Sequence, residues 1–160
     1  MNDVIVWPLL SNVIRRRLVN HTFGLVRKRA DGTPRPHQGW DFEAPVGEPA
    51  YAIARGEVEF VRQKGDYGLQ VCMSFAFEGQ TLYAFYAHLH KAYVQPGQSV
   101  EPNDFIAACG DSGNAKGMPK ADQHLHLEIR TKLKPGLGLA DRLNPITVFK
   151  KCPLHSPIAG

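Results

Sequence analysis

The chain has 160 residues, 43% of them hydrophobic, and a formal net charge of +4 at pH 7. A chain of this length can form one domain with a core large enough to fold unaided, and none of its apolar stretches approaches the roughly 20 residues that cross a bilayer. The positive charge favours anionic partners, but the basic residues are not interleaved with aromatic residues as in a nucleic-acid-binding surface. We therefore expect a monomeric single domain with no membrane span and no nucleic-acid partner.

The three cysteines, Cys72, Cys109 and Cys152, are unevenly spaced along the chain. They are too few for a disulfide framework and include no Cys-X-X-Cys metal motif. Buried free thiols are the favoured interpretation, with one disulfide among the three pairs left open.

Residues 1–19 are interpreted as a lead-in segment, in which Val13 and Leu18 have partly helical spacing around three arginines. The apolar start of this segment is short, is broken by Pro8 and lacks a preceding positive region, so it does not match a secretory signal. Residues 31–36 contain proline and glycine and predict a surface loop.

This loop leads to His37 and Asp41, which are four residues apart. At that spacing the two side chains lie on the same side of either a helix or an extended segment. Pro36 and Gly39 favour the extended form or a loop. Taken alone, the pair is more often a loop histidine followed by a turn aspartate than a functional site.

From residue 41 onward, turn-forming residues recur at short intervals, which predicts a mainly β domain of antiparallel sheets. Residues 69–77 alternate with the period of two that a strand packed on a core shows. After a turn at residues 78–80, residues 81–88 alternate in the same way, and the predicted strand ends at His88. The apolar face of the first strand consists of Leu69, Val71, Met73, Phe75 and Phe77, and the second strand has Leu82, Ala84, Tyr86 and His88 on one face.

Residues 110–123 lack periodicity and predict a long loop, a feature that is usually functional in a compact domain. Residues 124–130 then alternate again and predict a strand. Its core face carries Leu125, Leu127 and Ile129, and its other face carries His124, His126, Glu128 and Arg130. Two imidazoles two residues apart on a strand are roughly 6 to 7 Å apart, so one can hold a metal while the other reaches metal-bound water. A His-X-His pair alone is also common on surfaces. Residues 143–146 are expected to pack back on the core.

Four motifs therefore follow one another: His37-X-X-X-Asp41, Tyr86-Ala87-His88-Leu89, Gly110-Asp111-Ser112-Gly113 and His124-Leu125-His126-Leu127-Glu128. Together they resemble the LytM/lysostaphin-type zinc metallopeptidases, peptidase family M23, over roughly residues 20–148. The resemblance implies a mainly β single domain of antiparallel sheets, similar to the duplicated hybrid motif, with an open groove. It leaves residues 1–19 as the lead-in segment and residues 149–160 as a C-terminal tail.

The resemblance also implies a site. His37, Asp41 and His126 match the ligands of one Zn²⁺ per chain, and His88 and His124 match two catalytic histidines. Two imidazoles and one carboxylate leave the fourth position of a tetrahedral zinc open, as a catalytic site needs. Because no His-Glu-X-X-His helix supplies a glutamate base, His88 and His124 are expected to act as base and as oxyanion stabiliser, with the division of roles left open.

Some positions depart from the family pattern or fall outside it. Ser112 stands where the family's Gly-X-Thr-Gly element usually has threonine, and the loop of residues 113–124 is several residues longer than usual. Both changes are expected to affect the choice of substrate. His90 and His155 match no motif and are expected at the surface, and His21 is a weaker candidate for the groove lining.

The function that the resemblance implies is hydrolysis of the peptide cross-links of peptidoglycan, in the periplasm or cell wall. D-alanyl to meso-diaminopimelate bonds are favoured over glycine bridges. Because no secretory signal is recognised, a further expectation is an antibacterial effector delivered by a dedicated machine such as type VI secretion, with a cognate immunity protein covering the groove. A removed signal and release by lysis are the alternatives.

Two other functions compete with hydrolysis. A catalytically inactive LytM-like domain would act as a binding or activator module, but such domains lack ligand residues, whereas all five site residues are present here. A two-histidine phosphocarrier on a related β fold would leave the pair of His37 and Asp41 without a purpose. Metal analysis of the purified protein distinguishes a zinc hydrolase from a phosphocarrier, which needs no metal.

Overall fold

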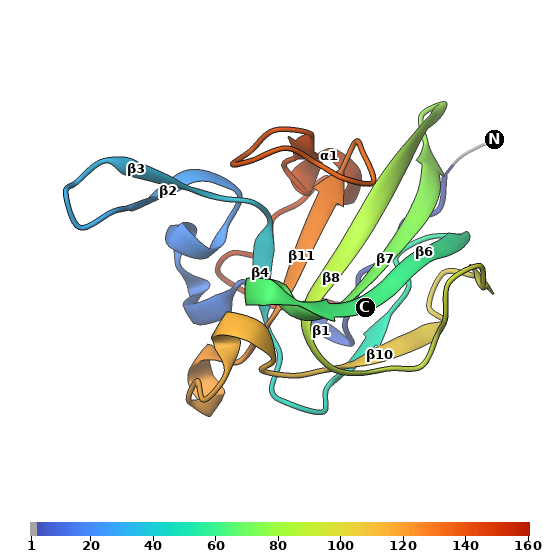
Figure 1. Cartoon of the computed structure of the whole chain (residues 1–160), viewed down its shortest axis with the longest axis horizontal. Helices are drawn as coiled ribbons and strands as arrows, with labels where there is room; N and C mark the ends of the chain where they lie inside the picture. Colours follow the sequence, from blue (N-terminus) through green and yellow to red (C-terminus); the bar gives the residue numbers. More distant parts are fainter. Residues whose placement is uncertain (1–2) are drawn as a thin grey trace.

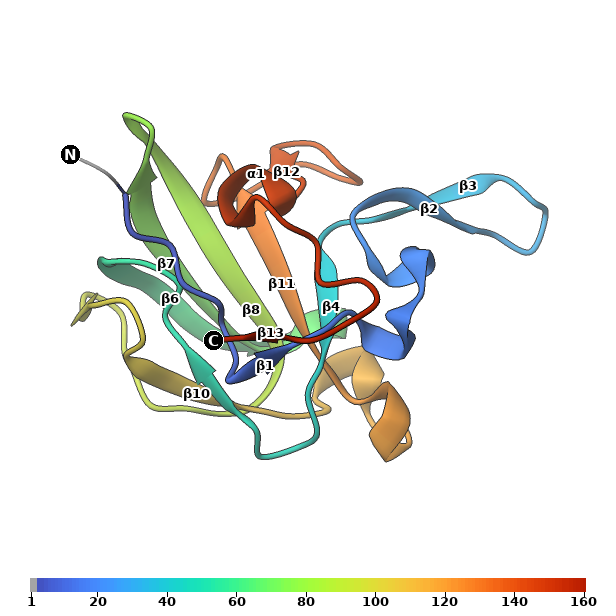
Figure 2. The same cartoon turned by 180° about the vertical axis from the view of Figure 1, so that it is seen from behind.

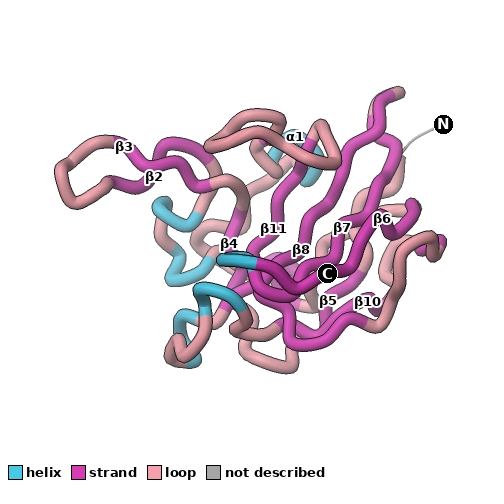
Figure 3. The backbone as a smooth tube through the Cα atoms, in the orientation of Figure 1, coloured by secondary structure: helices cyan, strands magenta, loops and turns pink. Residues whose placement is uncertain are grey.

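The computed structural model describes residues 3–160 as a mainly β fold (Figures 1 and 3). The strands are β1 (Ser11–Asn12), β2 (Gly24–Lys28), β3 (Pro34–His37), β4 (Trp40–Glu43), β5 (Pro49–Tyr51), β6 (Gly56–Lys64), β7 (Gly68–Phe77), β8 (Gln80–Ala92), β9 (Ser99–Val100), β10 (Phe105–Cys109), β11 (His124–Arg130), β12 (Arg142–Leu143) and β13 (Ile158–Ala159). The helical segments are α1 (Ile146–Phe149) and the 3-10 turns η1 (Arg15–Arg17), η2 (Val19–His21), η3 (Gly65–Tyr67), η4 (Gly113–Ala115) and η5 (Lys120–Asp122). Within residues 3–160, no helix reaches the length and hydrophobicity that a membrane-spanning helix needs.

Strand β11 lies between the strands that carry the other predicted site residues. It pairs antiparallel with β8 along one edge and with β4 and β12 along the other. The sheet continues from β8 through β7 to β6, as Figure 1 shows. Strand β9 follows β6, and β10 pairs with both β5 and β8. The register places His126 opposite Asp41 on one side and Ala87 on the other. Residues far apart in the sequence are thereby aligned at one end of the sheet.

One face of the sheet forms the hydrophobic core. The buried core residues include Leu125, Leu127 and Ile129 of β11 and Val71, Met73, Phe75 and Phe77 of β7. The predicted alternation of residues 69–77 and 124–130 is therefore confirmed. The polar residues on the opposite face of β11 are also buried, which is unusual for charged side chains unless they are paired.

Both ends of the chain cover the back of the sheet (Figure 2). Strand β1 pairs antiparallel with β13, and Leu9 and Ile14 are buried in the core. Trp7 stacks on Phe149 of α1, with the two ring centroids 4.6 Å apart. The partly helical spacing in the lead-in segment does not correspond to an α-helix within residues 3–19. The helical structure described there consists of the 3-10 turn η1 and the first residue of η2.

Strand β8 differs from the prediction at His88. The strand continues to Ala92 instead of ending at His88, and His88 has a left-handed φ of 59°. The register between β7 and β8 shifts at this point, as it does at a β-bulge, where one extra residue re-aims a side chain. Tyr86 and Leu89 both enter the core. His88 therefore points to the opposite face from Tyr86, and the prediction that the two share a face was wrong.

The cysteines, the outlying histidines and residues 143–146 match the predictions in most respects. All three cysteines are free, and two of them are buried. His90 and His155 are exposed. Within residues 143–146, Leu143 packs against the core, whereas Ile146 is largely exposed.

Candidate metal centre

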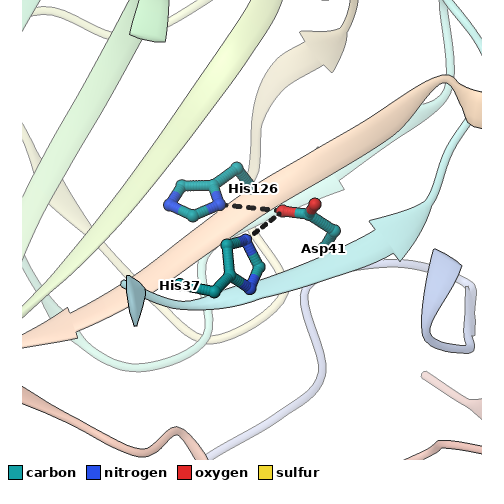
Figure 4. Close-up of side chains that lie close together, drawn as sticks. All are labelled: His37, Asp41 and His126. Atoms are coloured by element: carbon teal, nitrogen blue, oxygen red, sulfur yellow. Dashed lines mark hydrogen bonds and ion pairs between the residues drawn. The ribbon is translucent and has the colours of Figure 1, made fainter. Parts of the chain in front are cut away.

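Three side chains from neighbouring segments converge beside β11. His37 is the last residue of β3, Asp41 lies in β4, and His126 is opposite Asp41 on β11. Asp41 Oδ1 is 2.8 Å from His126 Nδ1 and 3.1 Å from His37 Nε2 (Figure 4). All three residues are buried, and one candidate ligand atom of each lies within 4.8 Å of the others. The structure thus brings the three predicted ligands together, and their binding of a metal stays a prediction.

Gly39 allows the chain that enters β4 to approach β11 this closely. A Cβ atom on Gly39 would lie 2.1 Å from the carbonyl oxygen of Leu127. A position that another backbone approaches so closely needs glycine, which has no Cβ atom. The glycine between His37 and Asp41 therefore has a structural role in bringing these side chains to β11.

The hydrogen bonds of the two histidines leave lone pairs directed at Asp41. His37 Nδ1 lies 2.7 Å from the carbonyl oxygen of Thr22. A carbonyl oxygen only accepts, so we assign the proton to Nδ1 and the lone pair to Nε2. His126 Nε2 lies 2.8 Å from a carboxylate oxygen of Glu128, which assigns the lone pair of His126 to Nδ1 in the same way. Two lone pairs and a carboxylate oxygen that face one another are all acceptors, and a cation among them resolves the conflict.

The electrostatics of the cluster agree with a cation at this position. Burial by itself would lower the pKa of His126, but hydrogen bonds to Asp41 and Glu128 raise it to about 9. Burial would raise the pKa of Asp41, but the electrostatic interaction with His124 and hydrogen bonds with the surrounding histidines hold it well below its usual value. In the metal-free protein, a proton on His126 therefore takes the place of the cation. The nitrogen, nitrogen and oxygen donors fit Zn²⁺, which prefers such ligands.

Glu128 is a fully buried carboxylate that holds His126 from the far side of its ring. It accepts hydrogen bonds from Arg130 Nε at 2.9 Å and from Arg142 Nε at 2.8 Å, as well as from His126 and the hydroxyl of Tyr67. Burial would raise the pKa of Glu128, but the hydrogen bond and charge of His126 and the charges of the two arginines hold it below its usual value. Glu128 is therefore ionised, and it sets both the proton position and the orientation of the His126 ring.

His88 and His124 lie beside the cluster with their rings 5.0 Å apart. The Nδ1 atom of each is 2.8 Å from a backbone carbonyl oxygen, that of Ser112 for His88 and that of Asp122 for His124. Both histidines therefore donate through Nδ1 and present a free Nε2, which for His124 lies 3.7 Å from Asp41 Oδ2. Burial and the charges of neighbouring histidines lower the pKa of His88 to about 4, and burial lowers the pKa of His124. Both are neutral and able to accept a proton at pH 7.

The loop of residues 110–123 positions His88 through Ser112. The Ser112 hydroxyl accepts a hydrogen bond from Leu69 N at 2.9 Å and donates one to the carbonyl oxygen of Leu89 at 2.7 Å. The loop, which contains η4 and η5, is thereby tied to β7 and β8 next to the bulge at His88. Serine at this position, in place of the usual threonine, holds the carbonyl group that binds His88.

The cluster lies in a groove of about 750 Å³, and basic residues surround the second carboxylate oxygen of Asp41. Asp41 Oδ2 is 3.2 Å from Arg27 Nη2, 3.4 Å from Arg15 Nη1 and 3.6 Å from His21 Nδ1. His21, a weak candidate from sequence, does line the groove. Arg15, Arg27 and Tyr67 also line the groove, and none of the three was predicted as a groove residue. The one sequence feature that pointed to any of them was the run of three arginines at residues 15–17, and such a run does not indicate which residues its side chains contact.

These features define a metallopeptidase-like centre: a histidine, aspartate and histidine donor set with two further histidines, in an open groove on an antiparallel sheet. The model of peptidase family M23 matches residues 35–136, a segment that includes all five predicted site residues. The chain belongs to this family.

Curated relatives support the same family. The chain is 33% identical over 129 residues to the peptidoglycan DD-endopeptidase ShyA of Vibrio cholerae, covering 81% of this chain and 26% of that protein. It is 35% identical over 121 residues to the DD-carboxypeptidase/endopeptidase Mpg of Neisseria meningitidis, covering 76% of this chain and 24% of that protein. The chain therefore spans about a quarter of the length of these relatives.

Solved structures share the fold. A zinc-containing peptidase from Vibrio cholerae has a TM-score of 0.63 and 27% identity, over 88% of this chain and 39% of that one. The catalytic domain of lysostaphin from Staphylococcus simulans has a TM-score of 0.64 and 22% identity, over 81% of this chain and 90% of that one. The predicted LytM/lysostaphin-like fold class is confirmed by this likeness.

Proposed function

We propose that this chain is a zinc-dependent endopeptidase that hydrolyses peptide cross-links of peptidoglycan. His37, Asp41 and His126 hold one Zn²⁺ in this proposal, and His88 and His124 are the catalytic residues. The observation that carries it is the convergence of His37 Nε2, Asp41 Oδ1 and His126 Nδ1 on one point in the groove. All three atoms are acceptors, which a metal ion requires of its ligands.

The chemistry divides between the metal and the two free histidines. When bound, zinc would polarise the scissile carbonyl and lower the pKa of a water molecule from about 15.7 towards about 7. His88 and His124 each have a free Nε2 and a backbone carbonyl that holds Nδ1. One of the two would accept through Nε2 the proton that the attacking water loses and would pass it to the nitrogen of the leaving amine, and the other, in its form protonated at Nε2, would donate a hydrogen bond to the developing oxyanion. The arrangement supports either division of these roles.

The choice of peptidoglycan as substrate rests on the relatives. ShyA and Mpg are named as a DD-endopeptidase and a DD-carboxypeptidase/endopeptidase, which favours D-alanyl to meso-diaminopimelate cross-links over glycine bridges. The groove volume of about 750 Å³ falls within the range of about 300 to 1,000 Å³ that is typical of ligand-binding pockets.

The experiment that tests the proposal is digestion of purified sacculi by the zinc-loaded protein, with mass analysis of the released muropeptides. Conversion of cross-linked dimers to monomers, and its loss after chelation, are the expected results. The metal content should be one zinc per chain. Intact cross-links in the presence of bound zinc would overturn the proposed activity and favour the inactive binding or activator module.

We also propose that this protein is an antibacterial effector delivered by type VI secretion. In the producing cell, an immunity protein would neutralise it. All five site residues lie in one open groove, so a single partner can cover them together. Expression with a periplasmic export signal should be toxic to a Gram-negative host, and expression without it should not. Asp41→Ala serves as the inactive control, and equal toxicity of the exported and unexported forms would count against a periplasmic target.

A further inference from the structure

The β2–β3 hairpin presents two arginines to the groove. It extends beyond the sheet next to β4 (Figure 1). Arg27 on β2 and Arg35 on β3 are opposite one another in the register of the hairpin, and both line the groove. Opposed residues in an antiparallel pair have Cβ atoms roughly 4.5 to 5.5 Å apart, and like charges at that position are destabilising. Placing these two arginines opposite one another is therefore energetically favourable only if a negatively charged group lies close to them.

The protein supplies only part of that negative charge. Arg27 Nη2 contacts Asp41 Oδ2, and Arg27 Nε donates to the carbonyl oxygen of Asn20 at 2.7 Å. Arg27 Nη1 has no hydrogen-bond partner among residues 3–160. Arg35 is exposed and forms no ion pair within the part of the chain that the structure describes. Donors of both guanidinium groups therefore remain free in the groove.

The side chains that line the groove carry more positive than negative charge. The basic side chains of the lining are Arg15, Arg27, Lys28 and Arg35, and the acidic ones are Asp41 and Asp66. Asp41 already contacts two arginines and has one oxygen directed at the histidines. Positive charge in this part of the groove is therefore incompletely compensated.

We propose that Arg27 and Arg35 bind a free carboxylate of the substrate peptide, close to the scissile bond, so that the groove selects acidic peptides. A guanidinium group holds a carboxylate through two parallel N–H···O hydrogen bonds. Because Arg27 also contacts Asp41, this carboxylate lies next to the metal centre. The inference rests on the proposed function and adds a substrate class to it.

The experiment measures binding separately from hydrolysis. Two peptides with a D-alanyl to diaminopimelate link are made as ketomethylene analogues, which cannot be cleaved, one with a free carboxylate beside the link and one with that carboxylate amidated. Calorimetry on the zinc-loaded full chain gives the Kd of each. Arg35→Gln is the test variant, because Arg35 is exposed and forms no hydrogen bond or ion pair with any of the five site residues. Arg55→Gln is the matched control, because Arg55 pairs with Glu101 on an exposed surface outside the groove lining.

The wild-type protein should bind the free carboxylate form about two- to fivefold more tightly than the amidated form, the range of a partly exposed ion pair. Arg35→Gln should abolish this preference while leaving the Kd of the amidated form unchanged, and Arg55→Gln should retain it. Equal binding of the two forms by the wild type, no detectable binding of the carboxylate form, or a preference that persists in Arg35→Gln would each overturn the inference.

Cleavable versions of the same peptides test the proposed function independently. Cleavage without a carboxylate preference would overturn only the carboxylate subsite. A carboxylate preference that is lost in Arg35→Gln, without any cleavage, would support the subsite and overturn the hydrolytic function. Thermal unfolding of both variants checks that the fold is retained.

Discussion

His126 Nε2 lies 2.8 Å from a carboxylate oxygen of Glu128, two residues further along the same face of β11. This carboxylate fixes the His126 ring so that Nδ1 faces Asp41. Such outer carboxylates orient metal-binding histidines and raise their basicity. Arg130 and Arg142 in turn hold Glu128, so the geometry of the predicted metal site depends on residues that do not touch the metal.

Glu128→Gln is expected to lower the affinity for zinc by roughly 10- to 100-fold, the usual effect of losing an outer partner of a ligand. It should also destabilise the fold by roughly 3 to 5 kcal/mol, because two buried arginines lose their counter-charge. Competition with a chromophoric chelator measures the affinity, and urea unfolding measures the stability. Glu57→Gln, at an exposed position of β6, is the control. Unchanged zinc affinity in Glu128→Gln would show that the His126 ring does not need this partner.

The two histidines of β11 should respond differently to truncation. His126→Ala is expected to lose both zinc and activity, because it removes a proposed ligand. His124→Ala should retain zinc and lose turnover, with kcat lowered by roughly 10² to 10⁴-fold and little change in substrate binding. Metal analysis together with steady-state kinetics separates the two outcomes. Loss of zinc in both variants, or a mild effect of His124→Ala on kcat, would contradict the assigned roles.

Gly39→Ala is expected to unfold or strongly destabilise the protein. The added methyl group would lie 2.1 Å from the carbonyl oxygen of Leu127, so β4 and β11 would have to separate. Gly32→Ala is the comparison, because nothing lies within 4 Å of its Cβ position and only its φ of 86° opposes the change. That strain costs roughly 1 to 2 kcal/mol. Thermal unfolding of the two variants checks the prediction, and equal effects would contradict the steric argument.

Acidification should destabilise the metal-free protein through His88. Its pKa is lowered to about 4 in the folded state, compared with about 6.5 in an unfolded chain. Between about pH 4 and 6.5 the unfolded state therefore binds more protons at this position than the folded state does. The free energy of unfolding should fall as the pH falls through this window, by on the order of 3 kcal/mol, and then level off.

Urea unfolding in the presence of a chelator, at intervals from pH 4 to 7, measures this dependence. His88→Gln, which cannot titrate, is the control for the other groups that change protonation in the same range. The wild-type curve should be steeper than that of His88→Gln across the window. Parallel curves for the two proteins would show that His88 titrates normally in the folded state.

The strand of residues 124–130, the mainly β architecture and the family were all predictable from the amino-acid sequence alone. The alternation of leucine, isoleucine and polar residues there is a local property with a period of two, and the structure preserves it. The same holds for Val71, Met73 and Phe75 of β7. Motifs such as His37-X-X-X-Asp41 can also be recognised without any knowledge of distant contacts.

Only the tertiary structure decided which face His88 occupies. Alternation along residues 81–88 placed His88 with Tyr86, but the bulge between β7 and β8 reverses it. A bulge arises from the pairing of two strands, so neither strand's sequence alone specifies its position.

Tertiary structure also decided what surrounds Asp41 and Glu128. Arg15 and Arg27 lie beside Asp41, and Arg142 lies beside Glu128, although none of these arginines belongs to a motif. The sign and number of charges around a buried carboxylate depend on which distant segments fold against it. Local periodicity carries no information about such contacts, because it reports only which side of its own strand a residue occupies.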